Sequence, residues 1–284
     1  MEINIVCILG AGTLGSRIAL QAALSGYSVR VFDIHEQALE SSKKVMVKIL
    51  RQLSLPSQAL ESILFTTDPS IAVADADIIS ESVTEDLALK RMVWAQFGAL
   101  APEKTIFTTN TSYLLPSQIA DASGRPARFC AFHFHDVFYS KVVDIMPHPG
   151  SDLDLESILM EFGRKLNQVP VVVRKENHGY IFNAMLLAFI GAAGKLRTKE
   201  VASIEDIDKS WMVNFHMPMG PFGIIDSIGL DTAWHVTHGL EDPASQAFAA
   251  LLKTYIDAGK LGEKSGEGFY TYPAPSYRNP EFLN

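Results

Sequence analysis

The sequence of 284 residues has few of the features that mark secreted, membrane-spanning or nucleic-acid-binding proteins. It contains two cysteines, Cys7 and Cys130, each within an apolar stretch, so we expect buried, reduced thiols. The longest apolar run, residues 184–194, is too short to cross a bilayer. The 24 basic residues form no long run, and the net charge is −8. This balance argues against nucleic acid or an anionic membrane as the main partner.

Internal repeats and low-complexity segments are also absent from the sequence. The first apolar strand begins at Ile3, which leaves no room for a signal peptide, so we expect a cytoplasmic protein. Hydrophobic residues make up 48% of the chain, enough for sizeable cores. At roughly 100–200 residues per domain, the length predicts two domains.

Three glycines connect an apolar run at residues 5–9 to a helical apolar pattern at residues 14–24. Gly10 would permit a tight turn after the strand, and Gly12 would leave room for a pyrophosphate group. Gly15 would let the helix pack closely on the strand, while the helix N-terminus offers free N–H groups to phosphates. This arrangement is typical of a dinucleotide site.

The following segment favours a dinucleotide site over a structural turn. A second apolar strand at residues 29–32 ends in Asp33, the position that binds the ribose 2′-hydroxyl of NAD. A carboxylate there would repel the extra phosphate of NADP. The NAD-binding residues predicted in this part of the chain are Gly10, Gly12, Thr13, Leu14, Gly15 and Asp33.

Short buried strands alternate with helices up to residue 173, which predicts a Rossmann-type doubly wound, mostly parallel sheet and hence an α/β fold. The predicted strands are residues 5–9, 29–32, 63–66, 77–82, 105–109, 128–132, 142–146 and 169–173. The predicted helices between them include residues 14–24, 37–53, 87–100 and 153–166.

The composition changes near His178, after which we find no convincing strand before the tail. Residues 180–196 are apolar on nearly every side, which predicts a buried helix that packs partly against a second copy of the chain. We therefore predict an NAD-binding domain at residues 1–178. An all-helical domain for substrate binding and dimerisation would follow at residues 179–284, with Ser203 as a helix N-cap.

Polar side chains follow several predicted strands at the edge where such sheets bind ligands. His133, with Asp144 on the next strand, has the parts of an oriented general base. Ser112 follows another strand. Glu85 and Lys90 could meet the nicotinamide ribose, or equally be a helix-start acid and a solvated lysine.

Two histidine pairs raise the alternative of a metal site. His133 and His135 would share one face of a strand, and His235 and His238 could pair on a helix. No further nearby cysteine or carboxylate cluster completes either set, so we predict no metal.

A hydrolase triad is a second alternative, because Ser112, His133 and Asp144 supply its three residue types. Ser112, however, lies in TNTSY and not in a GxSxG elbow. The glycine turn would also have no use in a hydrolase.

The order of these segments resembles the L-3-hydroxyacyl-CoA dehydrogenase family over essentially the whole chain. In the first half the similar segments are GAGTLGS with Asp33, ESVTEDLALK, NTS, and CAFHF, which resembles the start of the family's GxHFFNP motif. In the second half they are HGYIFNAML, PMGPFGIIDSIGLDT and KLGEKSGEGFYTY.

The resemblance implies an NAD-dependent dehydrogenase that interconverts a 3-hydroxyacyl-CoA and a 3-oxoacyl-CoA. His133 would be the general base, oriented by Asp144, whose carboxylate would raise the pKa of the imidazole. Ser112 and Asn183 would bind the reacting oxygen.

The resemblance also implies NAD contacts outside the glycine turn. Glu85, Lys90 and Lys264 would contact the cofactor, and so would Ser112.

Two departures from the family motifs leave alternatives open. The loop after His133 is one residue shorter and lacks both prolines, so His135 and Asp136 form a rival pair for the catalytic role. An NAD-binding structural or sensing protein with little turnover is a further alternative.

The second departure concerns the CoA phosphates. The family's polar and basic positions are filled by Ile49 and Pro56, so a CoA ester is not assured. A free 3-hydroxy acid substrate, as in the gulonate dehydrogenase and lambda-crystallin relatives, stays an alternative that the altered loop at residues 134–141 favours. Neighbouring cations could substitute as phosphate partners, namely Lys43, Lys44, Lys48 or Arg51.

Overall fold

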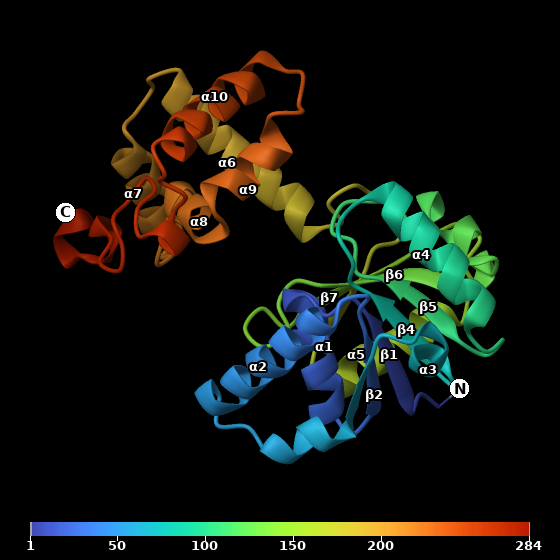
Figure 1. The fold of residues 1–284 in the computed structure, drawn as a ribbon. Helices are drawn as coiled ribbons and strands as arrows, with labels where there is room; N and C mark the ends of the chain where they lie inside the picture. Colours follow the sequence, from blue (N-terminus) through green and yellow to red (C-terminus); the bar gives the residue numbers. More distant parts are fainter. Residues whose placement is uncertain (1, 284) are drawn as a thin grey trace. The chain divides into compact units, whose positions relative to one another are not determined.

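The computed structural model describes residues 2–283 and forms two compact units, Met1–Phe182 and Asn183–Asn284 (Figure 1). The division lies in the turn that opens the first helix of the second unit, slightly beyond the predicted boundary at residue 178. Each unit has its own hydrophobic core. Among the described residues, no helix combines the length and the apolar character that a membrane crossing requires.

An eight-stranded sheet forms the centre of the first unit, in the order β3-β2-β1-β4-β5-β6-β7-β8. The strands are β1 (Ile5–Leu9), β2 (Ser28–Phe32), β3 (Ile63–Thr66), β4 (Ile78–Glu81), β5 (Ile106–Thr109), β6 (Phe129–Phe134), β7 (Val142–Pro147) and β8 (Val169–Val172). Neighbours pair in parallel except β6 and β7, which are antiparallel. The predicted doubly wound, mostly parallel sheet is confirmed, with β1 at the point where the strand order reverses.

Helices cover both faces of this sheet (Figure 1). One face packs against α1 (Thr13–Leu24) and α5 (Leu155–Lys165), and α2 (Glu36–Gln52) packs on α1. The other face packs against α3 (Pro69–Val73) and α4 (Leu87–Leu100). Strands buried on both faces need apolar side chains at every position, which is why they appear as continuous apolar runs in the sequence.

The two cysteines lie within these buried strands, as predicted. Cys7 and Cys130 are fully buried free thiols on β1 and β6. Burial raises the pKa of Cys7 to about 12, so this thiol stays protonated and unreactive.

Among the described residues, the second unit contains five α-helices: α6 (Phe182–Thr198), α7 (Ile204–Phe215), α8 (Pro221–Ile228), α9 (Leu230–Thr237) and α10 (Pro243–Asp257). The predicted N-cap of α7 is confirmed, because the Ser203 hydroxyl accepts a hydrogen bond from the Asp206 N–H at 3.0 Å. The core of this unit includes Ile190, Phe222 and Leu252.

The prediction that the first of these helices is buried is wrong for the single chain. Only Ile190, Ala193 and Gly194 are buried in α6, whereas Met185 is 61% exposed and Leu196 is 43% exposed. A small helical unit cannot surround an all-apolar helix, so part of its apolar surface faces outward.

Two buried carboxylates hold the second unit together. Asp208 on α7 accepts hydrogen bonds from the first N–H groups of α8, those of Phe222 at 2.8 Å and Gly223 at 3.0 Å. Asp226 on α8 accepts the N–H groups of Phe269 and Tyr270 in the tail, both at 2.8 Å. These bonds satisfy the helix start and fix the tail against the helices.

Candidate functional site

The glycine turn has the geometry that a dinucleotide site requires. Gly10 adopts φ +102°, and a Cβ there would lie 2.7 Å from the Ser82 carbonyl oxygen. A Cβ at Gly15 would lie 2.0 Å from the Gly10 carbonyl oxygen, so α1 could not approach β1 as it does. A Cβ at Gly12 would meet nothing within 4 Å, so no packing inside the chain requires glycine at this position. The turn therefore fits a bound pyrophosphate next to the start of α1.

Asp33 follows β2 at the same edge of the sheet. Its carboxylate accepts hydrogen bonds from the N–H groups of Ala11 at 2.9 Å and His35 at 3.0 Å. The bond to Ala11 ties the acid to the glycine turn. Asp33 is thus fixed where the predicted ribose contact needs it.

Lys90 is not a solvated lysine, because it is 1% exposed. Its ammonium nitrogen lies 2.7 Å from Glu81 Oε1 and 3.3 Å from Glu85 Oε2. Glu81 also accepts a hydrogen bond from the Thr109 hydroxyl at 2.7 Å. A buried cation that binds two carboxylates positions both of them, Glu81 at the end of β4 and Glu85 shortly before the start of α4.

Glu85 in turn shapes the loop that carries Ser112. One carboxylate oxygen accepts hydrogen bonds from the Thr111 hydroxyl and from the N–H groups of Ser112 at 3.1 Å and Tyr113 at 3.2 Å. This role of Glu85 is not predicted by the sequence. A threonine and a serine that follow a strand near an acid are a weak signal, because such bonds depend on how two loops fold toward each other.

His133 and Asp144 form the predicted pair. They lie opposite each other in the antiparallel ladder of β6 and β7, and His133 Nδ1 lies 3.2 Å from Asp144 Oδ2. Both side chains are buried. The predicted strand at residues 128–132 in fact continues to Phe134, so His133 stands on a rigid strand and not in the loop after it.

A second histidine contacts the same oxygen. His135 Nε2 lies 2.8 Å from Asp144 Oδ2, and the two imidazole rings are 4.7 Å apart. The rival pair of His135 and Asp136 does not form, because Asp136 makes an ion pair with Arg17 on α1. Asp136 also accepts the N–H groups of two residues in the shortened loop, Phe138 and Tyr139.

The expected effect of Asp144, which raises the pKa of His133, is confirmed, but burial of the ring has a larger effect in the opposite direction. Burial lowers the pKa of His133, and the neighbouring His135 adds to this effect. The bond to Asp144 raises the pKa as expected, but by less than burial lowers it. Burial opposes ionisation of Asp144, yet its hydrogen bonds with His133 and His135 outweigh burial and lower its pKa. The pair at neutral pH is therefore a neutral imidazole and a carboxylate.

The expectation that no nearby carboxylate completes the pair of His133 and His135 is wrong, because Asp144 lies next to both histidines. The two hydrogen-bond distances to its Oδ2 atom account for the proximity of all three groups without an ion. His235 and His238 have ring centres 5.7 Å apart, and His238 stacks on Trp234.

Two predicted site residues belong to the second unit. Asn183 lies in the first turn of α6. Lys264 binds both carboxylate oxygens of Asp231 at 2.6 Å. Their contacts with substrate and NAD stay predictions.

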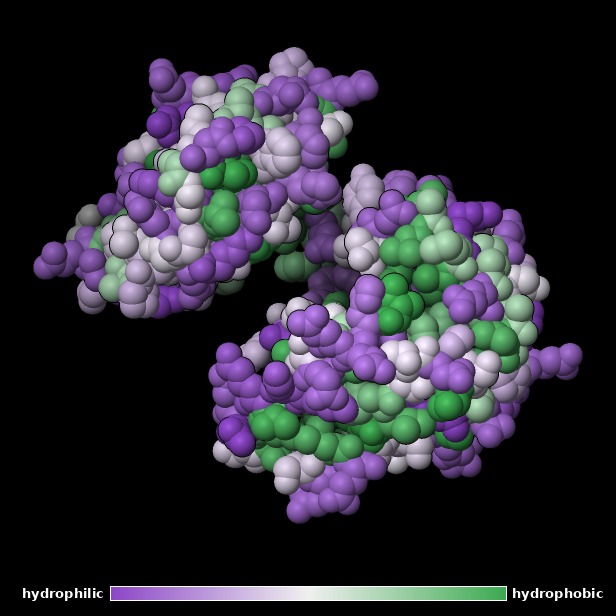
Figure 2. Space-filling view, viewed as in Figure 1, coloured by the Kyte–Doolittle hydropathy of each residue, from purple (hydrophilic) through white to green (hydrophobic). Residues whose placement is uncertain are grey.

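The outer side of α2 carries the cations that could meet a substrate's phosphates. A pocket of about 560 Å³ there is lined by Glu40, Lys43, Lys44, Val47, Lys48, Arg51 and Gln52. Figure 2 shows hydrophilic residues over this helix. Ile49, by contrast, is buried and cannot contact a ligand there.

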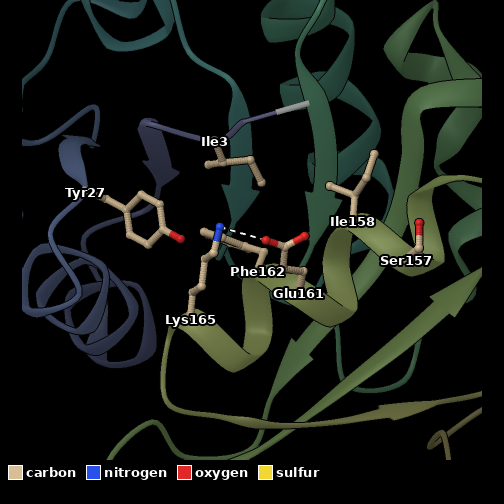
Figure 3. Close-up of a pocket in the computed structure, with 7 residues that line it drawn as sticks. All are labelled: Ile3, Tyr27, Ser157, Ile158, Glu161, Phe162 and Lys165. Atoms are coloured by element: carbon tan, nitrogen blue, oxygen red, sulfur yellow. Dashed lines mark ion pairs between the residues drawn. The ribbon is translucent and has the colours of Figure 1, made fainter.

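A second pocket, of about 260 Å³, lies elsewhere on the first unit (Figure 3). Its lining includes Ile3 and Tyr27, which precede β1 and β2, and Glu161 and Lys165 on α5, which form an ion pair at 2.8 Å. It therefore lies at the amino ends of the strands, whereas ligands of such sheets bind beyond the carboxyl ends.

Two family models match nearly all of the chain. Residues 5–177 match the model described as 3-hydroxyacyl-CoA dehydrogenase, NAD binding domain. Residues 179–272 match the model described as 3-hydroxyacyl-CoA dehydrogenase, C-terminal domain.

Individual relatives agree with these matches. The chain is 32% identical to the human mitochondrial hydroxyacyl-coenzyme A dehydrogenase, over 94% of this chain and 90% of the relative. It is 34% identical to a probable 3-hydroxybutyryl-CoA dehydrogenase of Deinococcus radiodurans, over 93% of this chain and 99% of the relative.

Among solved structures, a diketoreductase that acts on dicarbonyl compounds superimposes with a TM-score of 0.91 at 38% identity, over 96% of this chain and 100% of that one. The (S)-3-hydroxybutyryl-CoA dehydrogenase of Ralstonia eutropha superimposes with a TM-score of 0.84 at 27% identity, over 95% of this chain and 99% of that one.

Proposed function

The chain belongs to the 3-hydroxyacyl-CoA dehydrogenase family, and on this basis we propose that it interconverts a 3-hydroxyacyl-CoA and the 3-oxoacyl-CoA with NAD as its cofactor. The pair of His133 and Asp144, at the same sheet edge as the glycine turn, is the observation that carries the proposal. This chemistry would belong to fatty acid metabolism.

His133 is the proposed general base. Asp144 has a lowered pKa and is an acceptor, so His133 Nδ1 carries the hydrogen that is donated to it. His133 Nε2 then takes the proton of the 3-hydroxyl group, and Asp144 stabilises the imidazolium that forms. In the reverse direction the same nitrogen returns the proton to the carbonyl oxygen. NAD, when bound, accepts the hydride from C3 of the substrate.

The reacting oxygen needs a second set of contacts. We assign these to the Ser112 hydroxyl and the Asn183 amide, following the family motifs in which both residues lie. The Glu85 bonds that shape the Ser112 loop support the first assignment, since they hold the serine backbone in place.

The proposed NAD site begins with the glycine turn and Asp33. Glu85, Lys90, Ser112 and Lys264 complete it. Lys90 acts through Glu81 and Glu85, because its ammonium group is engaged by both carboxylates.

Lysines and Arg51 on the outer side of α2 are the proposed partners of the CoA phosphates. Lys43 is partly neutralised by Glu40 at 2.6 Å, which leaves Lys44, Lys48 and Arg51 as the main candidates.

A second candidate function is reduction of a dicarbonyl compound or oxidation of a free 3-hydroxy acid. It is favoured by the diketoreductase named above and by Ile49 and Pro56 at positions where the family binds CoA phosphates. A third, an NAD-binding protein with little turnover, is favoured by the altered loop after His133.

The helical unit is proposed to bind substrate and to form a homodimer in the cytoplasm. Exposed apolar residues of α6 and a groove of about 480 Å³ lined by Phe189, Trp211 and Phe215 support a self-association surface. A monomer in sedimentation at micromolar concentration would contradict this part of the proposal.

One assay separates the three functions. NADH consumption is followed optically with acetoacetyl-CoA, with acetoacetate and with a small β-diketone, each over a range of concentrations. The proposal expects the highest kcat/KM with acetoacetyl-CoA. Preference for either of the other compounds supports the second function, and tight NADH binding without turnover of any compound supports the third.

A further inference from the structure

Asp144 offers one carboxylate oxygen to two histidines. His133 Nδ1 lies 3.2 Å from Oδ2 and His135 Nε2 lies 2.8 Å from it, so the second histidine makes the shorter contact. All three side chains are at least nine-tenths buried. The His135 ring is further packed edge-on by Phe182 at 5.2 Å, which holds it in this position.

One negative charge cannot stabilise two cations at this distance. Asp144 is the acceptor for both rings, so each resting imidazole donates a hydrogen to it. If His133 takes a proton, its charge faces the His135 ring 4.7 Å away, and the carboxylate oxygen that stabilises this charge is also bonded to His135. His133 therefore receives only part of the stabilisation that Asp144 can give.

We propose that His135 is a positioning residue for the reaction: it holds Asp144 Oδ2 in place and takes part of the carboxylate's hydrogen-bonding capacity away from His133. The inference rests on the proposed function, in which His133 is the base. The family motif GxHFFNP has phenylalanine where this chain has His135, so the second donor is a departure of this sequence.

The surroundings of His133 support this assignment. Four titratable groups face it: His135 from β6, Asp144 from β7, Tyr180 from the turn before α6 with ring centres 5.1 Å apart, and Glu85 from the loop after β4. Of these, His135 lowers the pKa of His133, whereas Asp144 and Glu85 raise it. His135 is the one histidine in the set, and it is bonded to the same oxygen.

The test compares two kinds of substitution at residue 135. His135→Phe removes the second donor to Asp144 Oδ2, and His135→Gln keeps an amide donor near the position of Nε2. The pKa of His133 is measured by NMR titration of the histidine-labelled resting protein, and the pH profile of kcat/KM is measured in parallel. His235→Gln, at an exposed histidine of the second unit, is the matched control.

We expect His135→Phe to raise the pKa of His133 by about one pH unit, and to lower kcat/KM about tenfold on the acidic side of the profile. His135→Gln should change the pKa of His133 and the acidic side of the kcat/KM profile less than His135→Phe does. His235→Gln should change neither quantity. If His135→Phe does not fold, as judged by circular dichroism, His135→Leu replaces it.

An unchanged His133 titration in a folded His135→Phe or His135→Leu protein would overturn the inference. Equal shifts with Gln and Phe would also overturn it, because the donor would then have no role. If the NMR titration shifts and the pH profile does not follow, the link between His135 and His133 stands and the assignment of His133 as the base fails.

Discussion

Asp144 in the first unit and Asp208 in the second are both buried carboxylates, at 1% and 0% exposure, yet their pKa values shift in opposite directions. Asp144 is surrounded by two imidazoles, and their hydrogen bonds outweigh burial and lower its pKa. The donors that Asp208 finds among the described residues are neutral, namely the N–H groups of Phe222 and Gly223 and the Tyr270 hydroxyl at 2.9 Å. Burial outweighs these bonds and raises the pKa of Asp208 to about 6.

The difference is consistent with the proposed catalytic role of Asp144 in the first unit and with the packing role of Asp208 in the second. A carboxylate next to groups that can become cationic stays charged and can stabilise a proton on its neighbour. A carboxylate next to neutral donors keeps its hydrogen bonds, but these bonds stabilise its charge less than burial destabilises it.

Replacing His133, whose imidazole contacts Asp144, should give the largest loss of turnover. His133→Gln should lower turnover on the order of 10²–10⁴-fold, the usual contribution of a positioned general base, with little change in NADH affinity. Steady-state rates and fluorescence titration with NADH measure the two quantities. If His135→Gln abolishes turnover while His133→Gln keeps most of it, the site must be rebuilt around His135.

A third carboxylate, Asp33, acts through its charge on a ligand. Wild-type protein should prefer NADH over NADPH by on the order of 10²-fold in kcat/KM, because a carboxylate beside a 2′-phosphate is repulsive. Asp33→Asn should reduce this preference while turnover with NADH is largely kept. Equal efficiency with both cofactors in the wild type would be incompatible with the proposed role.

Matched amide substitutions test the contrast itself. Asp144→Asn should lower turnover about ten- to hundredfold and cost little stability, because an amide still accepts one hydrogen bond. Asp208→Asn should cost about 1–3 kcal/mol in the free energy of unfolding, since an amide cannot accept bonds from three donors, and should leave turnover of the folded protein unchanged. Denaturant titration and rate measurements on both variants check this prediction. A loss of stability without loss of turnover in Asp144→Asn, or a loss of turnover without loss of stability in Asp208→Asn, would contradict it.

The raised pKa of Asp208 predicts a pH effect on stability. The unfolded carboxyl group loses its proton near pH 3.8 and the folded one near pH 6, so this group's contribution falls as the pH rises through that window. Between pH 5 and pH 7, the free energy of unfolding of the wild type should fall by about 1 kcal/mol more than that of Asp208→Asn. Parallel losses in the two proteins would show that Asp208 does not titrate in this range.

The strands and the contact between His133 and Asp144 could be predicted because their signals are local. β1 and β3 have the predicted bounds, since each is a short apolar run between turn residues. Asp144 was identified because polar residues near strand ends meet at one edge of such a sheet. α3 was missed, because five residues are too few to show a helical period.

Features that depend on register or on burial depth could not be predicted. The contact of His135 with Asp144 requires the antiparallel register in which His133 pairs with Asp144, and the sequence does not fix that register. The net direction of the His133 pKa depends on how deeply the ring is buried. The exposure of α6 depends on how much of its surface one chain can cover.

The pH dependence of kcat/KM for the oxidation of 3-hydroxybutyryl-CoA by NAD, in wild type and in Asp144→Asn, tests most directly whether His133, held by Asp144, is the base. Because the imidazole must be neutral to accept the proton and its pKa is lowered, kcat/KM should rise with pH through a single limb below the ordinary value of 6.5 and then level off. In Asp144→Asn the limb should move to still lower pH, since the carboxylate no longer stabilises the charged ring. A limb well above 6.5, or one that stays in place when Asp144 becomes asparagine, would contradict the proposed mechanism.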